Sequence, residues 1–252
     1  MPGPPKKTLG IEGMLRPLRY NDENIRAIVL DIDDTLVETQ PIFEICCETL
    51  AADHGYDPVR VQEYMADIKV DKRKPVMPLE SMVRHLYPEI DIEEAVRWVS
   101  VYQKIALTHN YPAIPDALTF LEACMNRAHL GFCTNELTTI AIHRLQTAKL
   151  NPNRYFPAST RKGLEMQNGK TVGIKKPNPE VLRYFHNSFN VEPHELLMVG
   201  DMQTDYEVAK NAGSHGAIIL SNQFSREMME RFTGNPHHVF ESLTDLFRHL
   251  SV

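Results

Sequence analysis

The stretch "RAIVLDIDDTLVETQ" at residues 26–40 decides the fold, because a run of apolar and β-branched residues leads directly into three carboxylates. Apolar runs of this kind are typical of strands buried on both faces of a parallel sheet. Asp31, Asp33 and Asp34 then stand where like charges repel and where burial disfavours ionisation. An acidic surface loop is one interpretation, and a cation site that contains a nucleophile is the other.

Similar apolar runs recur along the chain, and helical periodicity fills the intervals between them. The runs are "HLGFCTN" at 129–135, "ELLMVGD" at 195–201, "GAIILSN" at 216–222 and "HVFES" at 238–242. Apolar stripes in "PDALTFLEACMNR" at 115–127 and "ELTTIAIHRLQTAKL" at 136–150 predict amphipathic helices. This alternation of strands and helices predicts a doubly wound, Rossmann-like α/β parallel sheet with right-handed crossovers.

One interval breaks the alternation, since residues 40–112 carry helical patterns but no convincing strand. A connection of that length with its own helices is better explained as an inserted helical module than as a crossover. The insertion leaves the chain just after the carboxylates, at the sheet edge where ligands of open α/β sheets bind. We therefore expect an N-terminal arm over 1–25, an α/β core over 26–39 and 113–252, and a helical cap over 40–112.

Composition narrows the functional classes. The chain has 252 residues, 42% of them hydrophobic, and a net charge of -6 without a strongly basic block, so a nucleic-acid footprint is not expected. No segment approaches the ~18 continuous apolar residues of a membrane span. The four cysteines form neither a disulfide framework nor a metal-binding pair, which favours a cytoplasmic setting. The oligomeric state is left open by these observations.

Four motifs in chain order resemble those of the haloacid dehalogenase superfamily. They are "DIDDT" at 31–35, Thr134 in "GFCTN", Lys176 in "IKKPNPEVL" and "GDMQTD" at 200–205. The helical insertion after the first motif is similar to the small cap of the branch that contains phosphoglycolate phosphatases and β-phosphoglucomutases. Alone, two aspartates in an acidic turn would be unremarkable, but four ordered motifs favour the chemical interpretation.

The resemblance implies an Mg²⁺-dependent phosphoryl transfer that begins at the first motif. Asp31 would be the nucleophile that forms an aspartyl-phosphate, and Asp33 would give and then take the proton. Asp31, the backbone carbonyl of Asp33, Asp201 and Asp205 would hold the metal, with Asp205 either a direct ligand or one step removed. Oxygen ligands of this kind favour Mg²⁺ over zinc.

The other two motifs would hold the phosphoryl group of the substrate. Thr134 and Asn135 stand at the start of a predicted helix, where a hydroxyl and backbone N–H groups bind a phosphoryl oxygen, although either residue also suits a helix cap. Lys176 would neutralise the phosphoryl oxygens and Asp31. Arg73, in the basic run "KVDKRKPVMP" at 69–78, is a candidate for recognising an acidic substrate, and a solvated face is the alternative.

The sequence thus predicts a phosphatase that acts on a small-molecule phosphate ester. A phosphomutase would use the same residues, and a binding or regulatory module with little turnover is an alternative of another class. Dehalogenation does not fit, because that branch does not need the second acid or the metal ligands. The dipeptide Asn168-Gly169 predicts a hairpin near the site entrance, and its role is open.

Overall fold

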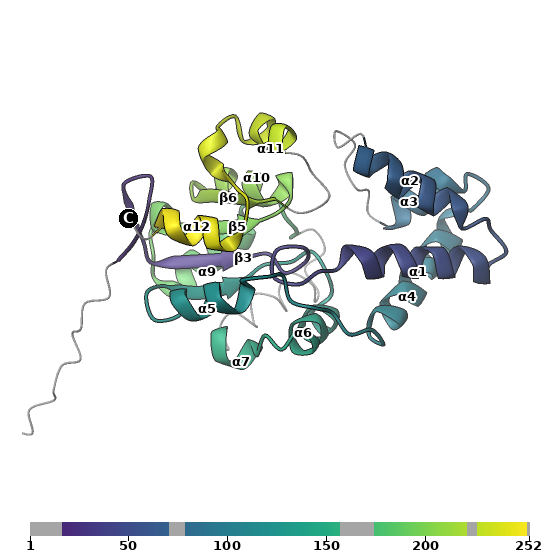
Figure 1. Cartoon of the computed structure of the whole chain (residues 1–252), viewed down its shortest axis with the longest axis horizontal. Helices are drawn as coiled ribbons and strands as arrows, with labels where there is room; N and C mark the ends of the chain where they lie inside the picture. Colours follow the sequence, from purple (N-terminus) through teal and green to yellow (C-terminus); the bar gives the residue numbers. More distant parts are fainter. Residues whose placement is uncertain (1–16, 71–78, 157–173, 221–225, 251–252) are drawn as a thin grey trace, which may run out of the picture.

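The computed structural model describes residues 17–70, 79–156, 174–220 and 226–250, which form a sheet-containing core and a separate group of helices (Figure 1). The core strands are β3 (Ala27–Leu30), β4 (His129–Phe132), β5 (Leu196–Gly200), β6 (His215–Ile219) and β7 (Val239–Phe240). The core helices are α5 (Ala117–Cys124), α6 (Thr138–Thr147), α7 (Pro152–Tyr155), α9 (Glu180–Phe189), α10 (Gln203–Ala212), α11 (Arg226–Thr233) and α12 (Leu243–Leu250), with 3₁₀ turns at Pro193–Glu195 and Pro236–His238. The separate helices are α1 (Gln40–Asp53), α2 (Val59–Val70), α3 (Leu79–Leu86) and α4 (Ile92–Ala106).

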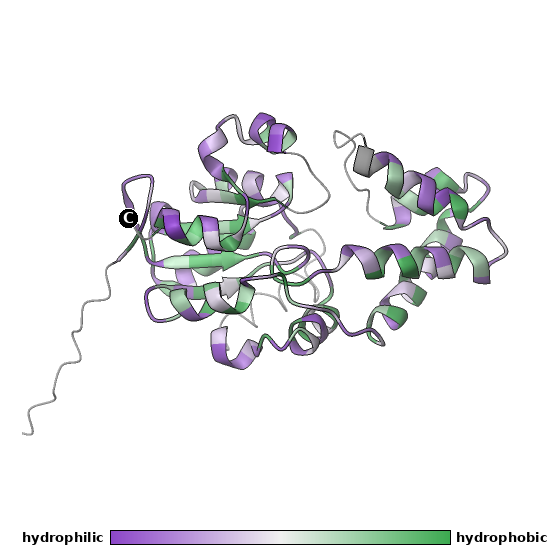
Figure 2. Ribbon diagram, viewed as in Figure 1, coloured by the Kyte–Doolittle hydropathy of each residue, from purple (hydrophilic) through white to green (hydrophobic). Residues whose placement is uncertain are grey.

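The core sheet is parallel throughout and has the strand order β4-β3-β5-β6-β7. Every residue of β3 and β5 is buried, which is why these strands read as continuous apolar runs. Figure 2 shows β3 in the hydrophobic colours, between helices that alternate polar and apolar residues. All five strands predicted from the apolar runs are present, so the doubly wound α/β fold is confirmed.

Helices cover both faces of the sheet because alternate residues of each strand point in opposite directions. Ile28 and Leu30 of β3 belong to the cluster that includes residues of α5, α6 and α12. Ala27 and Val29 belong to the opposite cluster, with residues of α9 and α10. β3 is therefore shielded from water on both faces, and its carboxyl end emerges between two helical layers.

The segment just before β3 is a small β-hairpin. β1 (Leu18–Tyr20) pairs antiparallel with β2 (Glu23–Ile25), and Leu18, Tyr20 and Ile25 are buried in the main core cluster. The Tyr20 hydroxyl donates to the Gly216 carbonyl at 3.2 Å. The surface arm expected over residues 1–25 is therefore wrong for residues 18–25, because alternating apolar residues in "LRYNDENI" pack on the core. Residues 1–16 lie outside the described part of the chain.

The four helices α1–α4 have their own apolar core, built around Cys47, Leu50 and Trp98. Their chain enters and leaves beside the site, where Glu38 N–H donates to the Pro112 carbonyl at 3.0 Å. Val37 also bridges to Ala113, so the two connecting segments run together. We call α1–α4 the cap. The two connecting segments lie next to the domain boundaries expected at residues 39/40 and 112/113.

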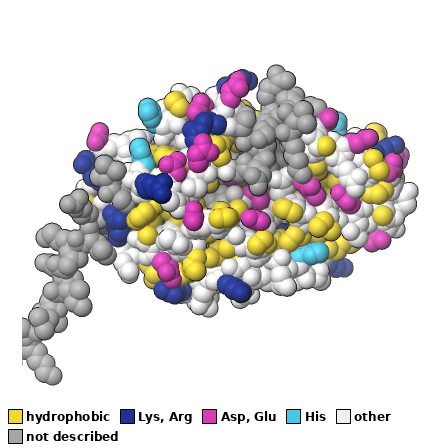
Figure 3. Space-filling model, viewed as in Figure 1, with side chains coloured by type: hydrophobic (Ala, Val, Ile, Leu, Met, Phe, Trp, Pro, Cys, Tyr) yellow, Lys and Arg dark blue, Asp and Glu magenta, His cyan; other side chains and the backbone are white. Residues whose placement is uncertain are grey.

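The visible surface carries both signs of charge. On the face shown in Figure 3, Lys and Arg side chains are interspersed with Asp and Glu rather than gathered by sign. None of the helices in the described ranges has both the length and the apolar character needed to cross a bilayer.

Candidate active site

Three separated segments bring the predicted site residues to one edge of the sheet. Asp31 directly follows β3, Thr134 follows β4, and Asp201 directly follows β5. Because β3 lies between β4 and β5, the strand order reverses at this point of the sheet. Carboxyl ends of strands at such a reversal form the usual ligand crevice of open α/β sheets.

Three buried carboxylates form a candidate metal centre at this edge. Asp31, Asp201 and Asp205 offer oxygen atoms that all lie within 4.8 Å of one another. The Thr35 hydroxyl donates to Asp201 Oδ1 at 3.4 Å, so this threonine supports the carboxylate cluster. A set of carboxylate oxygens is the donor set that Mg²⁺ takes in proteins.

Negative charge exceeds positive charge in this cluster. Burial raises the pKa of Asp31 to about 8, although the nearby Lys176 ammonium opposes the rise. Burial, followed by repulsion from neighbouring aspartates, raises the pKa of Asp201 well above its ordinary range. These carboxylates are therefore poorly stabilised as anions by the protein alone, and a divalent cation fits the cluster.

Lys176 supplies the ammonium at the centre of the site. Its Nζ lies 2.7 Å from Asp31 Oδ1 and 2.5 Å from Asp205 Oδ1. Burial lowers the pKa of Lys176, but the two carboxylates raise it by more, so the pKa lies well above its ordinary value. Asn135 fixes the loop that carries the lysine: its Oδ1 accepts from the Lys176 N–H at 2.9 Å, and its Nδ2 donates to the Lys176 carbonyl at 3.3 Å. Sequence reasoning gave Asn135 to the substrate, whereas its side chain here holds the lysine loop.

Asp205 has both carboxylate oxygens occupied. Oδ1 accepts from Lys176, and Oδ2 accepts from the Met202 N–H at 2.9 Å, where it caps α10. This close approach requires Gly200, because a Cβ at that position would lie 2.2 Å from the Asp205 carboxylate carbon. The Asp205 side chain is thus aimed at Lys176 as well as at the metal cluster.

The Asp33 carboxylate is not one of the three clustered carboxylates, although it stands only two residues beyond Asp31. Its Oδ1 accepts from Arg144 NH1 at 2.6 Å, and its Oδ2 accepts from the Thr134 hydroxyl at 3.3 Å. Asp33 remains 28% exposed at its side chain, whereas Arg144 is almost fully buried. The two carboxylates of the first motif therefore have different environments and different partners.

Arg144 was missed by sequence reasoning. It lies in α6 between Ala141 and Leu145, one turn after Ile140, on the face that packs inward. A single charged residue on the apolar face of a predicted helix is a usable signal, because a buried charge requires a partner. In the structure that partner is Asp33, which the sequence had already placed in the first motif.

Asp34 joins the first motif to the cap. Its φ of 53° lies in the left-handed region, which explains why glycine would also fit here. Its carboxylate accepts from the N–H of Thr39 at 2.9 Å, from the Thr39 hydroxyl at 3.0 Å and from the Gln40 N–H at 3.2 Å. Asp34 therefore holds the first turn of α1.

Two candidates from the sequence cannot be placed. Arg73 and the Asn168-Gly169 dipeptide lie outside the described residues, so both stay predictions.

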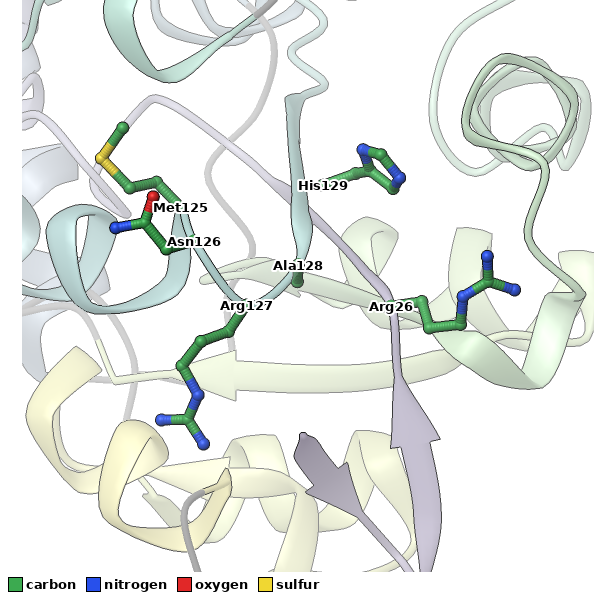
Figure 4. A pocket seen from close by; sticks show the side chains of 6 residues that line it. All are labelled: Arg26, Met125, Asn126, Arg127, Ala128 and His129. Atoms are coloured by element: carbon green, nitrogen blue, oxygen red, sulfur yellow. The ribbon is translucent and has the colours of Figure 1, made fainter. Parts of the chain in front are cut away.

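A shallow depression of about 310 Å³ lies at the other end of the sheet (Figure 4). It is lined by Arg26, Met125, Asn126, Arg127, Ala128 and His129. Arg26 precedes β3 and His129 begins β4, so this depression is at the amino ends of the strands. Arg26 pairs with Glu195 at 3.0 Å, and the guanidinium groups of Arg26 and Arg127 point apart in Figure 4. This depression is separate from the carboxylate cluster.

Comparison with known proteins gives one family match and many relatives. The family described as haloacid dehalogenase-like hydrolase matches residues 25–213. The phosphoglycolate phosphatase of Nitrosospira multiformis is 26% identical over 76% of this chain and 81% of its own. Phosphoglycolate phosphatase 1 of Pseudomonas aeruginosa is 26% identical over 88% of this chain and 78% of its own.

Solved structures share the architecture at lower identity. A family IA, variant 3 hydrolase of the same superfamily from Entamoeba histolytica superposes with a TM-score of 0.70 at 14% identity, over 90% of this chain and 98% of its own. A hydrolase from Pseudomonas syringae gives a TM-score of 0.64 at 21% identity, over 89% of this chain and 97% of its own. These likenesses concern the fold, including the helical insertion.

Proposed function

This chain belongs to the haloacid dehalogenase-like hydrolase family, and we propose that it is an Mg²⁺-dependent phosphatase of a small phosphate monoester. The observation that carries the proposal is the buried group of Asp31, Asp201 and Asp205 around the Lys176 ammonium. A bound Mg²⁺, held by Asp31, the backbone carbonyl of Asp33 and Asp201, with Asp205 either a direct ligand or one step removed, would neutralise phosphoryl oxygens. All other steps are assigned to side chains.

The first half of the reaction transfers the phosphoryl group to the protein. A carboxylate oxygen of Asp31 forms a bond to phosphorus, and the bond from phosphorus to the ester oxygen breaks. The electron pair of that bond stays on the leaving oxygen, which takes a proton from Asp33. Lys176 faces Asp31 and so also faces the phosphoryl oxygens, whose negative charge it offsets.

The second half regenerates the carboxylate. Water attacks phosphorus and gives its proton to Asp33, and the bond from phosphorus to Asp31 breaks with its electron pair returning to Asp31. The Thr134 hydroxyl lies 3.3 Å from Asp33, close enough to hold a phosphoryl oxygen beside the acid. Asn135 contributes by fixing Lys176, and its backbone N–H remains our candidate phosphate donor.

In this proposal the chain divides into a cap over residues 40–112 and a core over residues 26–39 and 113–252. The core carries the chemistry, and the cap selects the substrate. The relatives named phosphoglycolate phosphatase suggest a short ester with a second acidic group as the first compound to test. In this proposal Arg73 meets that acidic group. A cytoplasmic location also remains part of the proposal.

The test is release of inorganic phosphate from a panel of phosphorylated metabolites that includes phosphoglycolate and p-nitrophenyl phosphate. Wild type is compared with Asp31→Asn, and Asp53→Asn serves as a matched change at an exposed aspartate, each with Mg²⁺ and with a chelator. Turnover that needs Asp31 and Mg²⁺ but not Asp53 supports the proposal. Phosphate returned to a second hydroxyl of a sugar phosphate would instead assign a mutase, and no Asp31-dependent chemistry would refute both.

A further inference from the structure

Arg144 makes more contacts than a surface arginine could. Its side chain is 3% exposed, and NH1 donates to Asp33 Oδ1 at 2.6 Å. NH2 donates to the Tyr102 hydroxyl at 2.9 Å and lies 3.4 Å from Glu136 Oε2. The guanidinium carbon also stands 5.2 Å from the centre of the Tyr111 ring. The Arg144 guanidinium thus joins the loop that carries Asp33, helix α6 and the cap.

Stability alone does not explain this arrangement. Removing a guanidinium from water costs several kcal/mol, and apolar residues of similar volume often replace buried ion pairs without loss. Within the described residues, Arg144 Nε is buried and has no hydrogen-bond partner, so the network is incompletely satisfied. Because burial of the Arg144 guanidinium is unfavourable in itself, its position beside Asp33 points to a role in the reaction.

We propose that Arg144 is a positioning residue that orients the Asp33 carboxylate for proton transfer and anchors it to the cap through Tyr102. The inference rests on the proposed function, because it requires Asp33 to exchange a proton with the ester oxygen. Oδ1 accepts from the charged Arg144 guanidinium at 2.6 Å, whereas Oδ2 accepts from the neutral Thr134 hydroxyl at 3.3 Å, so we assign the transferred proton to Oδ2, the oxygen with the weaker donor. That oxygen faces Thr134, on the side where the phosphoryl group is placed.

Tyr102 extends this arrangement into the cap. It lies in α4, belongs to the apolar core of the cap and packs edge-on against Phe43 of α1 at 5.7 Å between ring centres. Arg144 comes from α6 of the core, so its guanidinium bridges the two units. The orientation of the acid therefore depends on where the cap stands.

Leaving-group chemistry separates positioning from a merely structural role. An alkyl phosphate needs a proton on its departing oxygen, whereas p-nitrophenolate departs without one. The ratio kcat/KM covers only the steps up to aspartyl-phosphate formation, so it reports Asp33 as an acid and not as a base. The experiment measures kcat/KM for the best alkyl phosphate of the panel and for p-nitrophenyl phosphate, with Mg²⁺.

The variants are Arg144→Met, Arg144→Lys and Tyr102→Phe, with Tyr87→Phe as the control. Tyr87 is another buried cap tyrosine, whose hydroxyl donates to the Asp57 carbonyl at 2.8 Å, away from Asp33. We expect Arg144→Met to lower kcat/KM on the alkyl ester by roughly 100-fold and on the aryl ester by less than about 10-fold. Arg144→Lys and Tyr102→Phe should show the same selectivity with smaller losses, and Tyr87→Phe should show none.

Equal losses on both esters, or no loss on either, would overturn the inference while leaving the proposed function intact. In an Asp33→Asn background, Arg144→Met should cause no further loss on the alkyl ester, because the acid it positions is already absent. If Arg144→Met does not fold, Tyr102→Phe carries the same comparison. Absence of Asp31-dependent turnover in wild type would overturn the proposed function, and the inference with it.

Discussion

Replacing Asp31 by asparagine should stabilise the metal-free protein increasingly as the pH rises. Burial raises the pKa of Asp31 from an ordinary value of 3.8 to about 8. A raised pKa in the folded state means that the folded protein holds the proton more tightly than the unfolded chain does. The stability contributed by the protonated group is complete below pH 4 and is lost as the pH rises through 8.

The size of the effect follows from the pH range. Between pH 5 and pH 8 the carboxyl group of Asp31 is largely protonated in the folded protein and ionised in the unfolded chain. Each pH unit therefore lowers the free energy of unfolding of wild type by up to about 1.4 kcal/mol. Over that range the difference between the variant and wild type should grow by up to roughly 4 kcal/mol. For a chain of this size that corresponds to roughly 8–16 °C in Tm.

Thermal unfolding of both proteins at pH 5, 6, 7 and 8 in a chelating buffer measures this trend. The contact between the asparagine amide and Lys176 adds an offset that does not vary with pH, so the slope is the result that matters. Asp53→Asn should run parallel to wild type. Added Mg²⁺ should flatten the slope, because it stabilises ionised Asp31. A difference in Tm that stays constant from pH 5 to pH 8 would refute the reasoning.

Three other expectations follow from single contacts. Gly200→Ala should lower the free energy of unfolding in urea by about 1–3 kcal/mol or more, because its Cβ would meet Asp205 at 2.2 Å; an unchanged midpoint would contradict this close approach. Asp34→Ala should destabilise by about 1–2 kcal/mol through the lost bonds to Thr39, and Asp34→Gly by less, because glycine accepts the φ of 53°. The opposite ranking would argue against backbone strain at this position. The four cysteines are buried, with the pKa of Cys46 raised by burial to about 11, so a disulfide reagent at pH 8 should modify them slowly in the folded protein and rapidly in urea.

The sheet was largely predictable because each strand leaves a local signal. Runs such as "AIVL" and "LLMV" are short, continuous and followed by polar residues, which is what a strand buried on both faces requires. The hairpin at 18–25 was missed because its strands have only three residues each, too few for a period of two to stand out. Its burial comes from contacts with β6 and α12, which lie far along the chain.

In the candidate site, too, residues in local motifs were predictable and contacts between distant segments were not. Asp31, Lys176 and Asp201 were found because each follows a strand or precedes a proline in a recognisable motif. The pairing of Asp33 with Arg144 depends on how α6 packs against the loop after β3, and no local sequence pattern reports that packing. The use of Asn135 to hold the Lys176 backbone was likewise invisible, because an asparagine beside a helix start has several equally ordinary uses.

The position of β3 between β4 and β5 has a consequence for synthesis of the chain. β3 is the first core strand to leave the ribosome, yet it pairs with β4 at residue 129 and with β5 at residue 196. At ribosomal speeds the interval before β5 appears is on the order of ten to thirty seconds. During that time α1–α4, which form one continuous segment with its own apolar core, are already complete. The cap is therefore able to fold before the core sheet, and the carboxylates of Asp31 and Asp201 meet only after the chain has been made as far as residue 201.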